Sequence, residues 1–196
     1  MKYLYKLSVF ITIIFLFFFQ TNNVLAKSTN KNEFLKLVKK AEQLDKSQNK
    51  RTKEGYLLRL KIEKDFNISK LKINKKARGR FYFYVCDGAR VFNWTANRLD
   101  KVIYYCSKSY ENYNKAKNFD EKELGNLELY LREGIASFSA WKYLTRGGID
   151  NKRKAKEHVT KLLESNKEFF FYKNGLKVMS VLSRAEDNQE GQIIYQ

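Results

Sequence analysis

The amino-terminal 26 residues constrain this chain more than any other segment. Lys2 and Lys6 give a short basic start, and residues 7–19 form an apolar run. Residues 20–23 are polar, and Val24-Leu25-Ala26 supplies the small residues of a cleavage site. This is the layout of a secretory signal peptide, and the apolar run is shorter than the roughly 20 residues that a membrane-spanning helix needs. We therefore expect residues 1–26 to be a signal peptide that is removed on export.

What remains, residues 27–196, is expected to form a single basic domain. Its length suits one hydrophobic core. The expected location is the periplasm or the outside of a bacterium, with a eukaryotic secreted protein as the alternative. An uncleaved amino-terminal anchor is the alternative to cleavage. No later stretch of the sequence is apolar for long enough to span a membrane.

Cys86 and Cys106 are the only cysteines in the chain. In an oxidising compartment an isolated pair is most simply a disulfide. A reactive thiol or a metal site is the alternative, but His158 is the only histidine, so no metal is expected. A bridge requires Cα atoms within about 7 Å, whereas one unbroken helix between the cysteines would separate them by about 30 Å. The chain is therefore expected to turn back around residues 97–100.

The spacing of apolar residues predicts three helices, over residues 32–45, 121–146 and 151–165. Asn30 and Glu33 form a capping-box-like start to the first. Gly147-Gly148 marks the end of the second.

Strands are predicted between and after these helices. Some of these segments alternate apolar with polar residues, and others are rich in β-branched and aromatic residues. Asn174-Gly175 between two apolar runs predicts a tight hairpin. The resulting fold class is α+β, an antiparallel sheet packed against the three helices. Its strands are expected at residues 56–62, 71–73, 81–86, 90–94, 101–106, 168–173, 176–182 and 192–195.

The net charge of +18 is concentrated near the start of the mature chain. Residues 27–80 hold 18 Lys and Arg against 6 Asp and Glu. A second basic group lies at the start of the predicted 151–165 helix. Such charge attracts anionic partners. The alternative is a biased genome composition that raises lysine everywhere. The candidate anion-binding residues are Lys70, Lys72, Lys75, Lys76, Arg78, Arg80, Lys152, Arg153, Lys154 and Lys156.

These features favour an exported, non-catalytic binding protein over an enzyme. The expected partner is an anionic envelope polymer, lipid head groups or an acidic exported protein, as for an immunity, inhibitor or envelope accessory protein. Nucleic acid is disfavoured because it is scarce outside the cytoplasm. The sequence contains no catalytic motif and calls for no cofactor. The alternative is a small hydrolase whose site is built from dispersed acidic residues, which requires a pocket with clustered titratable groups.

Overall fold

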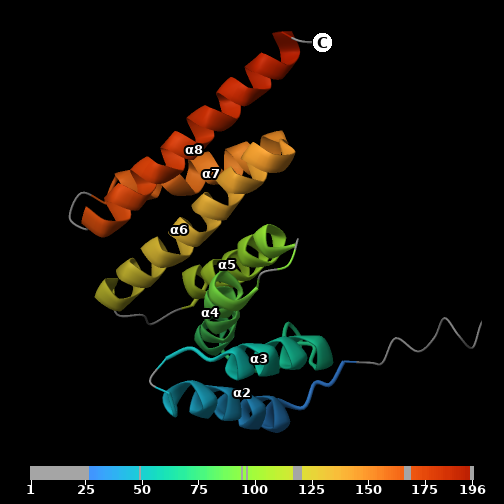
Figure 1. The fold of residues 1–196 in the computed structure, drawn as a ribbon. Helices are drawn as coiled ribbons and strands as arrows, with labels where there is room; N and C mark the ends of the chain where they lie inside the picture. The colour runs from blue at the N-terminus through green and yellow to red at the C-terminus, as the bar shows by residue number, and fades with distance from the viewer. Residues whose placement is uncertain are drawn as a thin grey trace, which may run out of the picture.

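The computed structural model describes residues 27–194 except 49, 94, 96, 117–120 and 166–168, with side chains left undescribed at 121–125 and 189–194. The described residues form seven helices and no strand (Figure 1). The predicted α+β fold with its antiparallel sheet is therefore wrong. The predicted signal peptide lies outside the described residues. The helices are α2 (Lys31–Lys46), α3 (Lys53–Asp65), α4 (Lys75–Phe92), α5 (Arg98–Asn114), α6 (Glu121–Arg146), α7 (Ile149–Leu163) and α8 (Phe169–Ile194).

The helices are arranged as a stack of antiparallel pairs (Figure 1). The pairs are α2 with α3, α4 with α5, and α6 with α7, and α8 covers α6 and α7. Most helices pack against their neighbours along the chain, and α8 packs on α6 as well as on α7. Helix α6 joins the first four described helices to the last two.

The three predicted helices are confirmed as α2, α6 and α7. The Asn30 side chain accepts a hydrogen bond from the Glu33 backbone N–H at 3.1 Å, as the capping pattern predicts. Gly147 and Gly148 end α6 with φ values of 67° and 93°. Only glycine adopts such a backbone conformation readily, and this allows α7 to turn back along α6.

Residues 56–62, in which apolar and polar residues alternate, are part of α3, so the strand predicted there is wrong. The buried residues are Tyr56, Arg59 and Ile62, which lie three apart, while Leu57 is 51% exposed. The predicted strand put every second residue, from Tyr56 to Ile62, on its buried side. Arg59 then fell on the solvent side, which suits an arginine because this residue type is normally exposed. It is buried because Asp45 of α2 forms an ion pair with it at 2.8 Å.

The aromatic segment 81–86 belongs to α4, where Phe81, Tyr82, Val85 and Cys86 are buried in neighbouring pairs one helical turn apart. The strands predicted at 90–94 and 101–106 are also wrong. They fall at the carboxyl end of α4 and in the first half of α5. Residues 71–73 lie in the loop before α4, with Leu71 buried. Aromatic and β-branched residues favour strands only weakly, because packing context overrides the preference.

The Asn174-Gly175 hairpin and the strands on either side of it are replaced by α8. A Cβ at Gly175 would lie 3.2 Å from Leu162 Cβ and 3.0 Å from Leu163 Cδ2. The glycine therefore permits close packing of α8 on α7 rather than a turn. The strand predicted at 192–195 is replaced by the last turn of α8 as far as Ile194.

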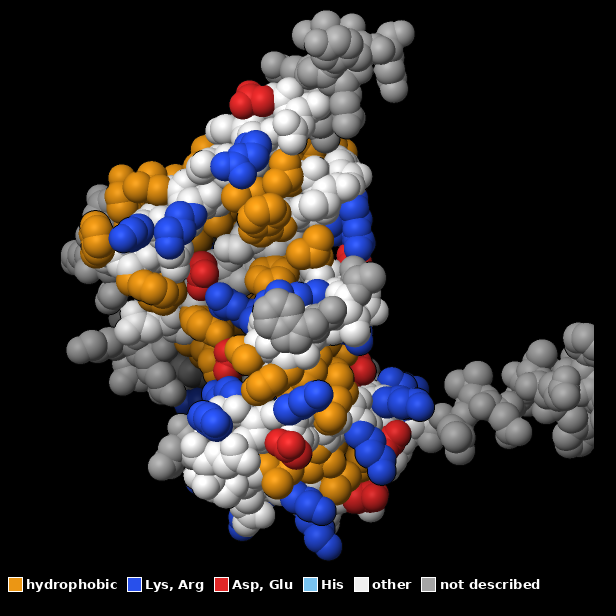
Figure 2. All heavy atoms as spheres, viewed as in Figure 1, with side chains coloured by type: hydrophobic (Ala, Val, Ile, Leu, Met, Phe, Trp, Pro, Cys, Tyr) orange, Lys and Arg blue, Asp and Glu red, His pale blue; other side chains and the backbone are white. Residues whose placement is uncertain are grey.

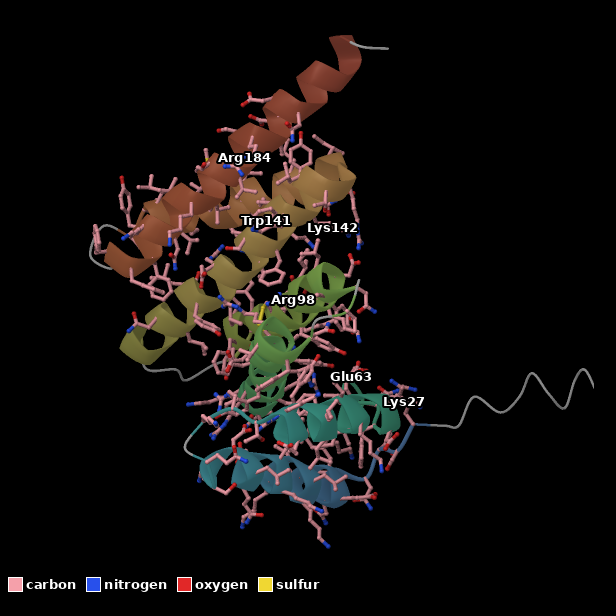
Figure 3. All side chains as sticks on the ribbon, viewed as in Figure 1. Lys27, Glu63, Arg98, Trp141, Lys142 and Arg184 are labelled. Carbon is pink, nitrogen blue, oxygen red and sulfur yellow. A yellow bond between two sulfur atoms is a disulfide. The ribbon has the colours of Figure 1, made fainter. Side chains whose placement is uncertain are left out.

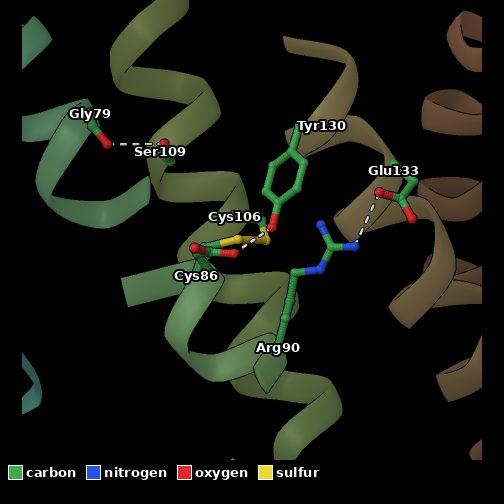
Figure 4. The surroundings of a disulfide bond; sticks show 8 residues. Gly79, Cys86, Arg90, Cys106, Ser109, Tyr130 and Glu133 are labelled. Atoms are coloured by element: carbon green, nitrogen blue, oxygen red, sulfur yellow. Dashed lines mark hydrogen bonds and ion pairs between the residues drawn. A yellow bond between two sulfur atoms is a disulfide. The ribbon is translucent and has the colours of Figure 1, made fainter. Parts of the chain in front are cut away.

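The predicted disulfide is confirmed. Cys86 of α4 and Cys106 of α5 are fully buried, and their Cα atoms are 5.0 Å apart (Figure 4). The chain does turn back between the cysteines, but between residues 92 and 98 rather than at 97–100, and two helices rather than two strands flank the turn. Ser109 Oγ donates to the Gly79 carbonyl at 3.0 Å, a second link between the paired helices.

The core has two parts that meet at α6. Leu131 and Ile135 of α6 belong to a cluster shared with α2 to α5, which includes the disulfide. Ala136 and Ala140 belong to a second cluster, shared with α7 and α8.

Candidate functional site

The first predicted basic cluster surrounds the start of α4. Arg78 is half-buried and donates to the Leu71 carbonyl at 3.1 Å. Arg80 forms an ion pair with Glu42 of α2 at 3.3 Å. The other members of the cluster are exposed: Lys70, Lys72, Lys75 and Lys76.

The second predicted basic cluster lies on α7, in its first half. Lys152 and Lys156 both contact Glu186 of α8, at 2.7 and 3.2 Å. Hydrogen bonds from these lysines lower the pKa of the Glu186 carboxyl. Arg153 pairs with Asp150 at 2.8 Å. Much of this cluster is therefore matched by acids, and its remaining member, Lys154, is exposed.

The structure does not bring the two predicted clusters together. The first lies at the start of α4 and the second on α7, with α5 and α6 between them (Figure 1). A partner that touches one cluster does not need to touch the other.

The outer side of α8 combines exposed apolar and basic residues. Phe169 is 73% exposed, Phe170 63%, Leu176 49% and Met179 36%. Lys173 and Lys177 lie among them and are also exposed. We call these six residues the α8 face: Phe169, Phe170, Lys173, Leu176, Lys177 and Met179.

The α8 face is free of acidic residues. From Phe169 to Ala185 the helix has no aspartate or glutamate. Figure 2 shows hydrophobic and basic side chains side by side along α8, with an acid only toward its carboxyl end. Trp141, labelled on α6 in Figure 3, is 46% exposed, and the same figure marks Arg184 on α8.

A polar pocket of about 420 Å³ lies among α3, α4, α5 and the loop after α3. We call it the α3–α5 pocket. Its lining combines buried apolar side chains, such as Phe66 and Ile68, with charged side chains of both signs. Arg78 is the one member of the predicted basic clusters that lines it. The lining residues are Lys27, Glu63, Phe66, Asn67, Ile68, Ser69, Arg78, Tyr82, Tyr104, Lys108, Glu111 and Asn112.

Two tyrosines of the α3–α5 pocket have raised pKa values. Burial raises the pKa of Tyr82 to about 12. Burial, with Glu63 and Glu111 as the next causes, raises the pKa of Tyr104. Lys108 lies 3.9 Å from Glu111 on the same helix. The pocket can therefore offer carboxylates, phenols and an ammonium group to a polar ligand.

The segment just after the predicted cleavage site packs at the rim of this pocket. Ser28 donates to the Asp65 carbonyl at 2.8 Å and accepts from the Asn67 N–H at 2.9 Å. Lys27 Nζ donates to the Glu63 carbonyl at 3.1 Å (Figure 3). The chain from Lys27 onward thus belongs to the folded domain.

Buried ionic contacts hold the turn between α2 and α3 against α4. Asp45 pairs with Arg59, and its Oδ1 accepts from the Thr52 N–H at 3.0 Å. Arg51 reaches Asp87 of α4 at 2.8 Å. Because these charges are paired with one another, the network serves the fold and offers no net charge to a partner.

His158 is also a structural residue. It is 6% exposed, and its Nδ1 lies 3.3 Å from Arg132 Nη1. Burial and the neighbouring Arg132 guanidinium lower the pKa of His158 to about 4. Since arginine only donates, Nδ1 accepts and the ring proton is on Nε2. Arg132 also donates to the Tyr110 hydroxyl, so this contact joins α5, α6 and α7.

Two kinds of site are missing from the described part of the chain. No three His, Cys, Asp or Glu residues there are grouped so that they could hold a metal ion. None of the helices described there has the length and apolar character required to cross a membrane.

Sequence reasoning missed the α8 face because the predicted hairpin split it between two strands. The signal was present in the helical spacing of Phe169, Lys173, Leu176 and Lys177. It also missed the α3–α5 pocket, whose residues come from four separate segments of the chain.

Comparison with protein-family models, curated proteins and solved structures finds no match to this chain. Its function must therefore be argued from its own residues.

Proposed function

We propose that this chain is an exported, non-catalytic protein that binds an anionic partner through the α8 face. The observation that carries the proposal is the exposure of Phe169, Phe170 and Leu176 next to Lys173 and Lys177 on an acid-free helix surface. The 1–26 segment and the Cys86–Cys106 disulfide support export, because disulfides persist in oxidising compartments.

Charge pairing favours the α8 face over the predicted cluster on α7. The cluster at the start of α4 keeps exposed lysines, but none of the exposed large apolar residues lies between residues 70 and 80. On α7, Glu186 holds Lys152 and Lys156, and Asp150 holds Arg153. No described acid pairs with Lys173 or Lys177 of the α8 face. Exposed, unmatched cations beside apolar surface attract anions more effectively than paired ones.

Charge reversal on α8 tests this proposal. Lys173→Glu combined with Lys177→Glu should weaken binding to dextran sulfate, a soluble polyanion, and should reduce the salt dependence of that binding. The matched control is Lys36→Glu with Lys40→Glu, which changes net charge equally at exposed positions of α2. Equal losses in the two double variants would show that only net charge matters, and the proposal would then fail.

The α3–α5 pocket supports a second candidate function, a hydrolase that uses paired carboxylates. The supporting observation is that Glu63 and Glu111, which come from different helices, line one pocket with Tyr104. Hydrolysis of glycosidic bonds uses two such carboxylates as acid and as base or nucleophile. Turnover of chromogenic glycosides that Glu63→Gln and Glu111→Gln each abolish would establish this function. Equal turnover by the variants and the native protein would exclude this pair.

A further inference from the structure

We propose that the anionic partner of the α8 face is the surface of a lipid bilayer, with α8 lying in the plane of the membrane interface. This inference rests on the proposed function because it uses the same face. Phe169 and Phe170 would enter the boundary between head groups and acyl chains, while Lys173 and Lys177 contact lipid phosphates.

The distribution of residues around α8 matches an interfacial helix. Its inner side packs Val178, Leu182 and Ala185 against α6 and α7. Its outer side still exposes large apolar residues, although the terminal helix of a stacked array ordinarily has a polar outer surface. A helix that exposes apolar and basic side chains together binds anionic membranes through buried apolar area and charge.

The exposed phenylalanines lie at the start of α8. Phe169 and Phe170 are the most exposed of the four apolar residues on the α8 face. Two aromatic rings at one end of a helix can enter a bilayer without unfolding any described contact of the core.

Charge argues against a second copy of the chain as the occupant of this surface. Two α8 faces placed together would bring Lys173 and Lys177 of one copy near the same lysines of the other. The acid-free stretch from Phe169 to Ala185 offers these lysines no counter-charge. A bilayer with anionic head groups supplies both the apolar layer and the counter-charge.

Sedimentation with vesicles tests the inference on the protein that starts at residue 27. The probes are vesicles of phosphatidylcholine alone and of phosphatidylcholine mixed with phosphatidylglycerol. The native protein should partition onto the mixed vesicles and much less onto the neutral ones. Phe169→Ser combined with Phe170→Ser should lower partitioning onto the mixed vesicles at least tenfold, because about two large side chains no longer enter the apolar layer.

Two controls show whether reduced vesicle binding by the Phe169 and Phe170 double variant has another cause, either a general loss of exposed apolar surface or a loss of folding. Leu35→Ser with Leu57→Ser removes two exposed leucines from α2 and α3, and should leave vesicle binding unchanged. The Phe169 and Phe170 double variant should keep its helical circular dichroism and its binding to dextran sulfate, since Lys173 and Lys177 remain.

The outcomes distinguish failure of the inference from failure of the proposed function. If Lys173 and Lys177 are needed for dextran sulfate binding but the native protein ignores anionic vesicles, the partner is a soluble polyanion or an acidic protein, and the bilayer inference is wrong. Vesicle binding that survives loss of both phenylalanines would also overturn it. If charge reversal at the two lysines changes neither dextran sulfate nor vesicle binding, the proposed function fails as well.

Discussion

His158 should make this protein less stable in mild acid. The ring is buried against Arg132 and Tyr110, and burial lowers the pKa of His158 from 6.5 to about 4. The unfolded chain therefore binds a proton on this side chain below pH 6.5, whereas the folded protein does so only near pH 4. Because the unfolded state holds more protons in this range, the free energy of unfolding falls as the pH is lowered from about 6.5 to about 4.

The size of the effect follows from the two pKa values. Proton linkage with pKa values of 6.5 and about 4 gives a loss of about 2.5 kcal/mol between pH 7.5 and pH 4.5. Urea unfolding followed by circular dichroism at these two pH values measures it. The comparison variant is His158→Gln, which cannot ionise and should lose about 2.5 kcal/mol less over the same interval.

Titrating carboxylates do not affect the difference between the native protein and His158→Gln, because both proteins contain the same carboxylates. Hydrogen bonds from lysines, first among the causes, lower the pKa of Asp100 and of Glu186. Both groups therefore also reduce stability in acid, but they do so equally with and without His158. If the native protein and His158→Gln lose the same free energy of unfolding between the two pH values, the reasoning about this buried ring is refuted.

Three further changes probe the core. Replacing Cys86 and Cys106 by alanine should lower the free energy of unfolding by about 3 kcal/mol, since the disulfide spans a sequence separation of 20, and a loss below about 1 kcal/mol in urea would contradict this. Gly88→Ala places a Cβ 2.4 Å from Tyr56 Cδ2 and should cost about 1–3 kcal/mol by overpacking, seen as a lower melting temperature. Arg59→Met leaves a buried carboxylate without its main partner and should cost about 3 kcal/mol, so an unchanged urea midpoint would disprove that role.

The helices that the sequence predicts are those with a clear apolar stripe. α2, α6 and α7 each repeat apolar residues at intervals of three and four, and Asn30 and Gly147-Gly148 mark ends that the structure confirms. The disulfide could also be predicted, because two cysteines allow only one pairing. In these cases a local signal is sufficient and no distant residue changes its meaning.

The predicted strands failed where the local signal depended on distant partners. Arg59 looks like a solvent residue until Asp45, on another helix, neutralises it. Gly175 looks like a turn residue until the side chains of α7 occupy the space next to it. Buried aromatic runs such as 81–86 suit a strand by composition, and only their packing within α4 identifies them as helical.

The candidate surfaces were predicted only in part. Clusters of lysine and arginine are visible in the sequence, but their ion pairs are not, and Glu186 pairs with Lys152 and Lys156 from a different helix. The α8 face could be recognised only after its segment was assigned as one helix. A period of two divides Phe169, Leu176 and Met179 between different sides of a sheet, whereas the helix places them on its exposed surface.

The packing of most helices on their neighbours along the chain affects how the protein reaches its native state. Contacts between segments that are close in sequence require only short loops to close, and proteins built from such contacts fold quickly. The α2–α3 pair needs nothing from the far end of the molecule to form its own contacts. Assembly can therefore proceed one pair at a time, with each new pair docking onto the one before it.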